Sequence, residues 1–154
     1  MKRTLTGRLV AVAVLSVIAY SLLYFLTRPL LPEDLARHAG PDGVGYSQLW
    51  ITVLIIGALA TLCLSIGIIV YRDFVSLGHW YPGPKAIAAC FLAAGFGILG
   101  LGTAMILTVL GREAEELGSQ PIAMGLLGLG LVFASSAGLL AKMLPRAKEE
   151  TLSD

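Results

Sequence analysis

The sequence predicts an all-α membrane protein, a bundle of four transmembrane helices with short loops that forms a single domain over residues 1–154. Three observations indicate this class. Of the 154 residues, 56% are hydrophobic and only 14% are charged, whereas about a quarter of an average soluble domain is charged. The mean hydropathy is +0.83. The hydrophobic residues also fall into four long blocks, and aromatic residues suited to the lipid–water interface, Tyr20 and Tyr24 among them, gather toward the block ends.

The four blocks cover residues 9–26, 49–71, 86–110 and 122–141, and none contains a charged residue, His, Asn or Gln. At ~1.5 Å per residue the shortest block reaches about 27 Å and the longest about 38 Å, against a hydrocarbon core of roughly 30 Å. Each block is therefore long enough to cross a bilayer. Because no small-x-small cleavage site follows the first block, we expect it to be a retained span and not a signal peptide.

Basic residues predict that the N-terminus and the C-terminus both face the cytoplasm, as in a multi-pass protein of the plasma membrane. In this arrangement eight basic residues are inside: Lys2, Arg3, Arg8, Arg72, Lys85, Lys142, Arg146 and Lys148. Three are outside: Arg28, Arg37 and Arg112. This bias follows the positive-inside rule for short loops.

The first outer loop is expected to contain a short helix over about residues 32–39. Pro32 and the acidic residues Glu33 and Asp34 would occupy its first turn, and Gly40 would end it. Such a helix could lie on the outer surface or cap the bundle.

Few side chains could support chemistry. The two histidines, His38 and His79, are expected on opposite sides of the membrane and so could not share a haem. Cys63 and Cys90 lie inside apolar blocks, without the spacing of a metal site. The paired acids, Ser/His pair or HExxH motif of intramembrane proteases are missing. We therefore expect no catalytic residue, no cofactor, no metal and no enzymatic activity. A net charge of +1 also argues against nucleic-acid binding.

The spacing of small residues is the strongest pattern in the chain. In the third block, a first stripe consists of Ala93, Gly97, Gly100 and Ala104, and a second stripe, about 200° away, of Ala88, Gly95 and Gly102. In the fourth block a further stripe consists of Ala123, Gly130, Ala134 and Gly138. The second block has a shorter series, Gly57, Thr61 and Ser65.

Faces of this kind let helix backbones approach closely in lipid. The alternative explanation is that glycine is simply frequent in membrane helices. We expect the third block to pack on the fourth or second block through one stripe and on a neighbouring chain through the other.

Two classes of function remain. The first is a structural or accessory membrane subunit, part of a homo- or hetero-oligomer in the lipid bilayer. The alternative is a component of an ion or small-molecule transporter or channel, or of an energy-converting membrane complex. The run Gly78-His79, followed by Pro82-Gly83 and an apolar span, resembles the entry to a span in the small B subunit of multisubunit cation/proton antiporters. The resemblance covers a few residues in a different loop and lacks that family's run of glycines, so it implies no functional residue.

Overall fold

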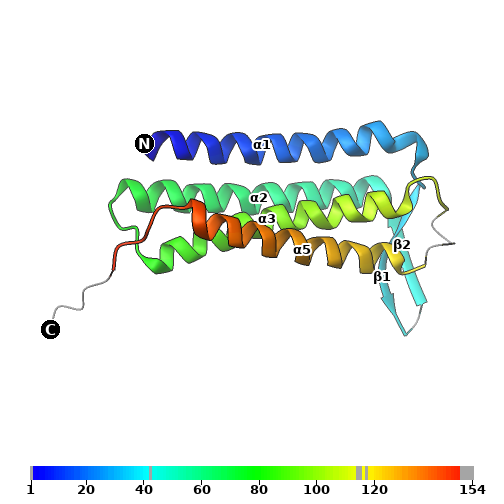
Figure 1. Cartoon of the computed structure of the whole chain (residues 1–154). Coiled ribbons are helices and arrows are strands. Elements are labelled where there is room, and N and C mark those ends of the chain that lie inside the picture. The colour runs from blue at the N-terminus through cyan, green and yellow to red at the C-terminus, as the bar shows by residue number, and fades with distance from the viewer. Residues whose placement is uncertain (1, 42, 114–115, 117, 150–154) are drawn as a thin grey trace.

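Four long helices form the body of the molecule (Figure 1). The computed structural model describes residues 2–41, 43–113, 116 and 118–149. The elements in chain order are α1 (Lys2–Thr27), the 3-10 turn η1 (Arg28–Leu30), β1 (Asp34–Gly40), β2 (Gly43–Gln48), α2 (Leu49–Ser76), α3 (Pro82–Val109) and α5 (Gln120–Met143). Each of α1, α2, α3 and α5 is long and apolar enough to span a membrane, which is compatible with an integral membrane protein.

The helices continue beyond the hydrophobic blocks into polar sequence. Helix α2 runs on through Arg72 and Asp73 to Ser76. Helix α3 begins at Pro82, earlier than the block at residue 86. Proline is tolerated there because the first turn of a helix leaves its N–H groups without intrahelical partners in any case. Hydropathy therefore locates the helices but underestimates their length.

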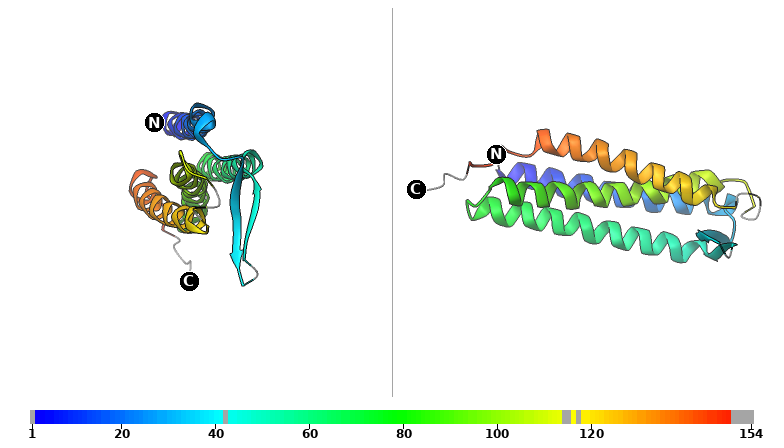
Figure 2. Two further views of the ribbon diagram at one scale, coloured as in Figure 1. Left: turned by 90° about the vertical axis from the view of Figure 1, so that its right-hand side faces the viewer. Right: turned by 90° about the horizontal axis from the view of Figure 1, so that it is seen from below.

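A two-stranded antiparallel hairpin projects from one end of the bundle (Figures 1 and 2). Strand β1 pairs with β2 so that Asp34 lies opposite Gln48, and the register shifts between Ala36 and His38. At the base of the hairpin, the backbone N–H of Leu49 donates to the carbonyl oxygen of Glu33 at 2.8 Å. The hairpin is thus joined directly to the start of α2.

This hairpin takes the place of the helix predicted over residues 32–39, so that prediction is wrong. A helix of this length is marginal because helix nucleation costs more than so few hydrogen bonds return. Pro41 is assigned to the turn, and the φ of 109° at Gly43 lies in the region that favours glycine. Strand pairing then satisfies backbone groups that a short helix would leave unpaired at both ends.

Helix α3 is the centre of the structure. It packs against α2 on one side and α5 on the other, while α1 lies against α2 and α3 (Figure 2). In α3, 44% of the most apolar 18-residue stretch is buried, against 6% in α5. Most of the surface of α5 therefore faces outward.

The start of α1 and the end of α5 lie at the same end of the bundle, called here the terminal end; the opposite end is the hairpin end (Figure 1). The basic side chains described at the terminal end are Arg8, Arg72, Lys85, Lys142, Arg146 and Lys148. Those at the hairpin end are Arg28 and Arg112. The remaining three that entered the charge count, Lys2, Arg3 and Arg37, have side chains outside the described part.

The segment after α5 closes the terminal end of the bundle. The indole Nε1 of Trp80 donates to the carbonyl oxygen of Pro145 at 3.1 Å. The backbone N–H of Lys148 donates to the carbonyl oxygen of Trp80 at 2.8 Å, and its Nζ donates to that of Gly78 at 2.9 Å. The Trp80 ring also meets the Tyr71 ring edge to face, with centroids 5.2 Å apart. The loop between α2 and α3 is thereby fixed to the C-terminal segment.

Candidate functional site: helix contacts and an open seam

The first stripe of α3 faces α5. A Cβ added at Gly100 would lie 2.7 Å from Val132 Cγ2 and 2.9 Å from the carbonyl oxygen of Gly128. A Cβ added at Gly128 would in turn lie 2.7 Å from Ala104 Cβ, and one added at Gly97 would lie 3.1 Å from Phe133 Cβ. The remaining stripe residue, Ala93, is fully buried. Glycine on both helices therefore sets the short distance between α3 and α5.

The second stripe of α3 faces α2 and α1. A Cβ added at Gly95 would lie 2.5 Å from Leu64 Cγ on α2. One added at Gly102 would lie 2.6 Å from Tyr20 Oη on α1. Ala88 is fully buried, and its carbonyl oxygen lies 3.1 Å from the Cβ position of Gly67 on α2. This stripe too is covered from within the chain.

The expectation that one stripe of α3 meets a neighbouring chain is therefore wrong. That expectation assumed a bundle in which each helix packs through one inward side and turns the opposite side to lipid. Instead α2, α3 and α5 lie in a row with α3 in the middle (Figure 2). A helix in the middle of a row needs a close-packing face on each of two opposite sides.

The stripe of α5 named from the sequence lies on the outside of the molecule. Ala123, Gly130, Ala134 and Gly138 are all exposed. Apart from their chain neighbours and the nearby backbone of α5 itself, no atom of the described structure lies within 4 Å of a Cβ added at Gly130 or Gly138. These four residues are called the outer stripe of α5. Gly130 and Gly138 therefore have no packing partner in the part of the chain that the structure describes.

Sequence reasoning missed the glycines that α5 and α2 turn toward α3. A Cβ added at Gly125 would lie 2.7 Å from Met105 Cγ, and one added at Gly67 would lie 2.7 Å from Leu92 Cγ. Gly125 and Gly128 are three residues apart and so share a helix face. That spacing was a usable signal, but the longer series ending at Gly138 concealed it.

Tyr20, in the C-terminal third of α1, was also missed as a contact residue. Its side chain is only 4% exposed, and its hydroxyl donates to the carbonyl oxygen of Val53 on α2 at 3.4 Å. The ring lies over two glycines, 3.7 Å from the Cβ position of Gly57 and 2.8 Å from that of Gly102. The tyrosine therefore fills the space between α1 and its neighbours and keeps the helices apart.

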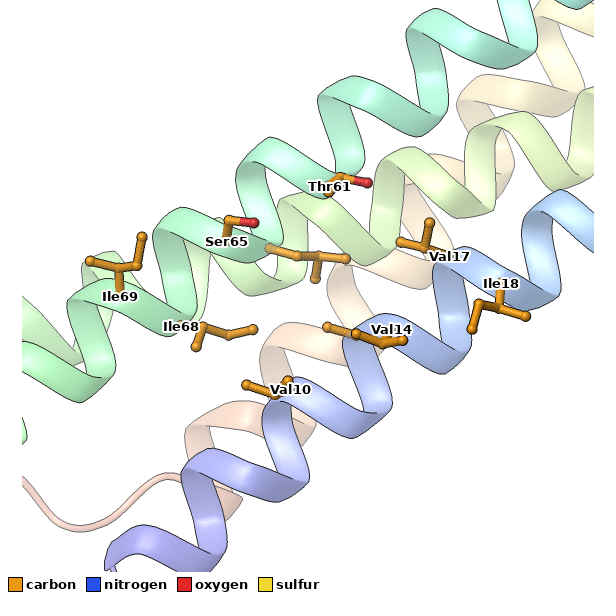
Figure 3. Close-up of a pocket in the computed structure, with 10 residues that line it drawn as sticks. Val10, Val14, Val17, Ile18, Thr61, Ser65, Ile68 and Ile69 are labelled. Atoms are coloured by element: carbon orange, nitrogen blue, oxygen red, sulfur yellow. The ribbon is translucent and has the colours of Figure 1, made fainter.

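An apolar groove runs along the seam between α1 and α2 (Figure 3). Its narrower part, about 410 Å³, is called the α1–α2 groove. The lining includes Val10, Val14 and Val17 from α1 and Thr61, Ser65 and Ile68 from α2. A wider part of about 920 Å³ shares Val17, Thr61 and Ser65 and continues toward the hairpin end.

Thr61 changes the apolar character of the groove little, although it carries a hydroxyl. Thr61 donates its hydroxyl hydrogen bond to the carbonyl oxygen of Gly57 in the same helix, at 2.7 Å. A threonine that bonds back to its own backbone in this way leaves its methyl group as an apolar contact surface. The groove is therefore suited to hydrocarbon and poorly suited to an ion.

Charged side chains are confined to the loops and the ends of the helices in the described part of the chain. No buried side chain there is charged, and no group of three His, Cys, Asp or Glu residues could hold a metal. Arg72 and Asp73 form an exposed ion pair, Nε to Oδ1, at 3.1 Å. The buried side-chain atom without a hydrogen-bond partner is Tyr71 Oη at the terminal end. These groups do not converge on one point as a catalytic set would.

Comparisons with protein-family models, with curated proteins and with solved structures find no match for this chain.

Proposed function

We propose that this chain is a non-enzymatic, multi-pass membrane protein that serves as a structural or accessory subunit by packing against another membrane chain. The observation that carries the proposal is the uncovered outer stripe of α5. The inner face of the same helix already makes close contact with α3 through Gly125 and Gly128. The outer stripe repeats that chemistry on the opposite side, where the described chain offers no partner.

The surroundings of the outer stripe fit a helix as its partner. Leu127 and Leu131, beside the stripe, are 53% and 61% exposed. Small residues flanked by leucine form a shallow channel along a helix, into which the ridge of a second helix fits. In lipid such contacts provide association through van der Waals packing, since apolar side chains gain little by leaving a hydrocarbon solvent.

The proposed orientation places both termini in the cytoplasm and the hairpin outside the plasma membrane. Its support is the distribution of described basic side chains, six at the terminal end and two at the hairpin end. Reporter fusions after residue 40 should register outside, and fusions after residue 78 or residue 149 should register inside. A reversed signal at any of these points would contradict the orientation.

A second candidate function is a component of a transporter or channel, or of an energy-converting membrane complex. The feature that favours it is the seam between α1 and α2, which is open along two connected grooves. A path for ions normally keeps ionisable or carbonyl groups at depth to replace lost water. Since the narrower groove is lined by aliphatic side chains and two hydroxyls, this function would require polar groups from other chains.

The decisive experiment is to measure the mass of the protein in mild detergent and in lipid nanodiscs. We expect a complex in both media, either with a second copy or with a larger membrane chain. Gly130→Leu combined with Gly138→Leu should reduce that complex to monomer without unfolding it. The matched control is Gly7→Leu, at another open helical glycine of the chain. A wild-type protein that is monomeric in both media, or a double variant that still associates, would refute the proposal.

A further inference from the structure

Helix α2 carries a cation about one turn beyond the lining of the α1–α2 groove. Along α2 the lining residues Ser65 and Ile68 lie on one helical face, and Arg72 follows them by seven and four residues on that same face. The Arg72 side chain is 67% exposed. Its Nε donates to Asp73 Oδ1 at 3.1 Å, which uses one of the five N–H donors of a guanidinium. An apolar groove thus leads to an exposed group that binds anions.

The size of the groove indicates what could occupy it. A helix with its side chains is at least about 10 Å across, so a 15 Å length of helix fills roughly 1,200 Å³. The α1–α2 groove offers about 410 Å³, so a helix would lie across this part of the seam and would not fill it. A hydrocarbon chain is much thinner and can bend to follow the walls. The combination of a narrow apolar groove and a cation one turn beyond it on the same helix face matches one amphiphile, a lipid with an anionic headgroup.

We propose that the α1–α2 groove binds an acyl chain of an anionic membrane phospholipid, whose phosphate is held by Arg72. In the groove the acyl chain contacts two helices at once, and the many small dispersion contacts add up. Guanidinium and phosphate form charge-assisted hydrogen bonds, which are stronger than neutral ones. The site requires that the chain lies in a bilayer, but it is independent of any partner at the outer stripe of α5.

The test uses the full chain in mild detergent, with dioleoyl phosphatidylglycerol and dioleoyl phosphatidylcholine added separately and binding followed by native mass spectrometry. We expect tighter binding of phosphatidylglycerol. Arg72→Gln should weaken it about fivefold, the order expected for one basic residue at an anionic lipid surface, and should leave phosphatidylcholine binding unchanged. Asp73→Asn should strengthen phosphatidylglycerol binding, because it removes the carboxylate that competes for Arg72. Arg8→Gln, also at the terminal end but on α1, is the control and should have no effect.

Filling the groove tests the acyl-chain half of the proposal. Val14→Trp should weaken binding of both lipids, and Ser65→Leu should do so from the α2 side, which guards against a local folding defect in either variant. The matched control is Val12→Trp, at a position that is 52% exposed and about 160° around α1 from Val14. Equal binding of the two lipids by the wild type would overturn the proposal. So would equal lipid binding by Val14→Trp and Val12→Trp. A loss of oligomer mass in Val14→Trp without a loss of lipid would instead identify a protein partner at the seam and would also overturn it.

Discussion

The contacts of α3 with α5 and with α2 differ from the contact between α1 and α2 in how closely the helices approach. Against α5, the Cβ position of Gly100 lies 2.9 Å from a backbone carbonyl oxygen, and against α2 that of Gly95 lies 3.0 Å from one. Between α1 and α2, by contrast, a tyrosine ring and two connected grooves separate the helices. A third groove, of about 620 Å³, lies on the side of α1 toward α3 and α5.

Residue size accounts for this difference. Helix α1 has a single glycine, Gly7, near its start, and its seam is lined by valines and isoleucine. Branched side chains and a tyrosine ring on a helix that has no glycine of its own along the seam keep the backbones apart, whereas glycine lets a neighbour reach the backbone itself. The molecule therefore has a closely packed row of three helices and a fourth helix that is held more loosely. The loosely held helix leaves room for small molecules, and the packed row does not.

The largest expected effect comes from removing the ring that holds α1 in place. Tyr20→Ala should lower the free energy of unfolding by about 3 kcal/mol, the lower end of the range for truncating a buried aromatic residue, because lipid can fill part of the space through the adjoining groove. The measurement is reversible unfolding in mixed micelles, with crosslinking between α1 and α2 as a local probe. Tyr24→Ala, one turn further at a half-buried position, is the control and should cost clearly less. Equal losses of unfolding free energy in the two variants would mean that Tyr20 does not determine how α1 packs against α2.

The next largest effects are expected where α3 packs closely against α5 and α2. Gly100→Leu and Gly95→Leu should each destabilise the bundle by about 1–3 kcal/mol, the usual cost of overpacking a core. Gly130→Leu, at an open position of α5, should leave the unfolding free energy of the monomer unchanged. Thermal unfolding of the three variants in one detergent compares them directly. If Gly95→Leu reduced only association between chains, the intramolecular contact of the second stripe would be refuted.

The helices could be predicted from the sequence because long apolar runs admit few other structures. The spatial arrangement of the helices could not be predicted, because a small-residue stripe has the same sequence pattern whether it faces the same chain or lipid. Gly95 and Gly130 illustrate the problem, since one is buried in a contact and the other is open. Tyr20 was predicted to lie at the lipid–water interface. Its depth in the membrane depends on the residue at which α1 begins, and the apolar block alone does not give that residue. The hairpin was missed because Pro32 followed by two acidic residues is typical of a helix start, and no turn at Gly43 was predicted.

A smaller effect is expected where the C-terminal segment closes the terminal end of the packed row. Trp80→Phe keeps an aromatic ring against Tyr71 but removes the 3.1 Å hydrogen bond to the Pro145 carbonyl oxygen. The cost should be about 1 kcal/mol, typical of one hydrogen bond, with faster amide exchange over residues 144–149. Trp50→Phe is the matched control, because its indole bonds to Gln48 at an exposed site. An unchanged exchange rate in Trp80→Phe would show that this bond does not hold the segment.

The smallest effect is expected from Tyr20→Phe, which removes the hydroxyl of Tyr20 and keeps its ring. The Oη to Val53 carbonyl distance of 3.4 Å exceeds the usual range of about 2.5–3.0 Å for such bonds. Hydrogen bonds between membrane helices average about 0.6 kcal/mol, so Tyr20→Phe should cost less than that and should preserve the crosslinks that Tyr20→Ala loses. This result would assign the spacing of the seam to ring volume. A cost as large as that of Tyr20→Ala would instead mean that the hydroxyl holds the helices together. It would place an energetically important polar group beside the wider groove and so favour the transport function over the structural one.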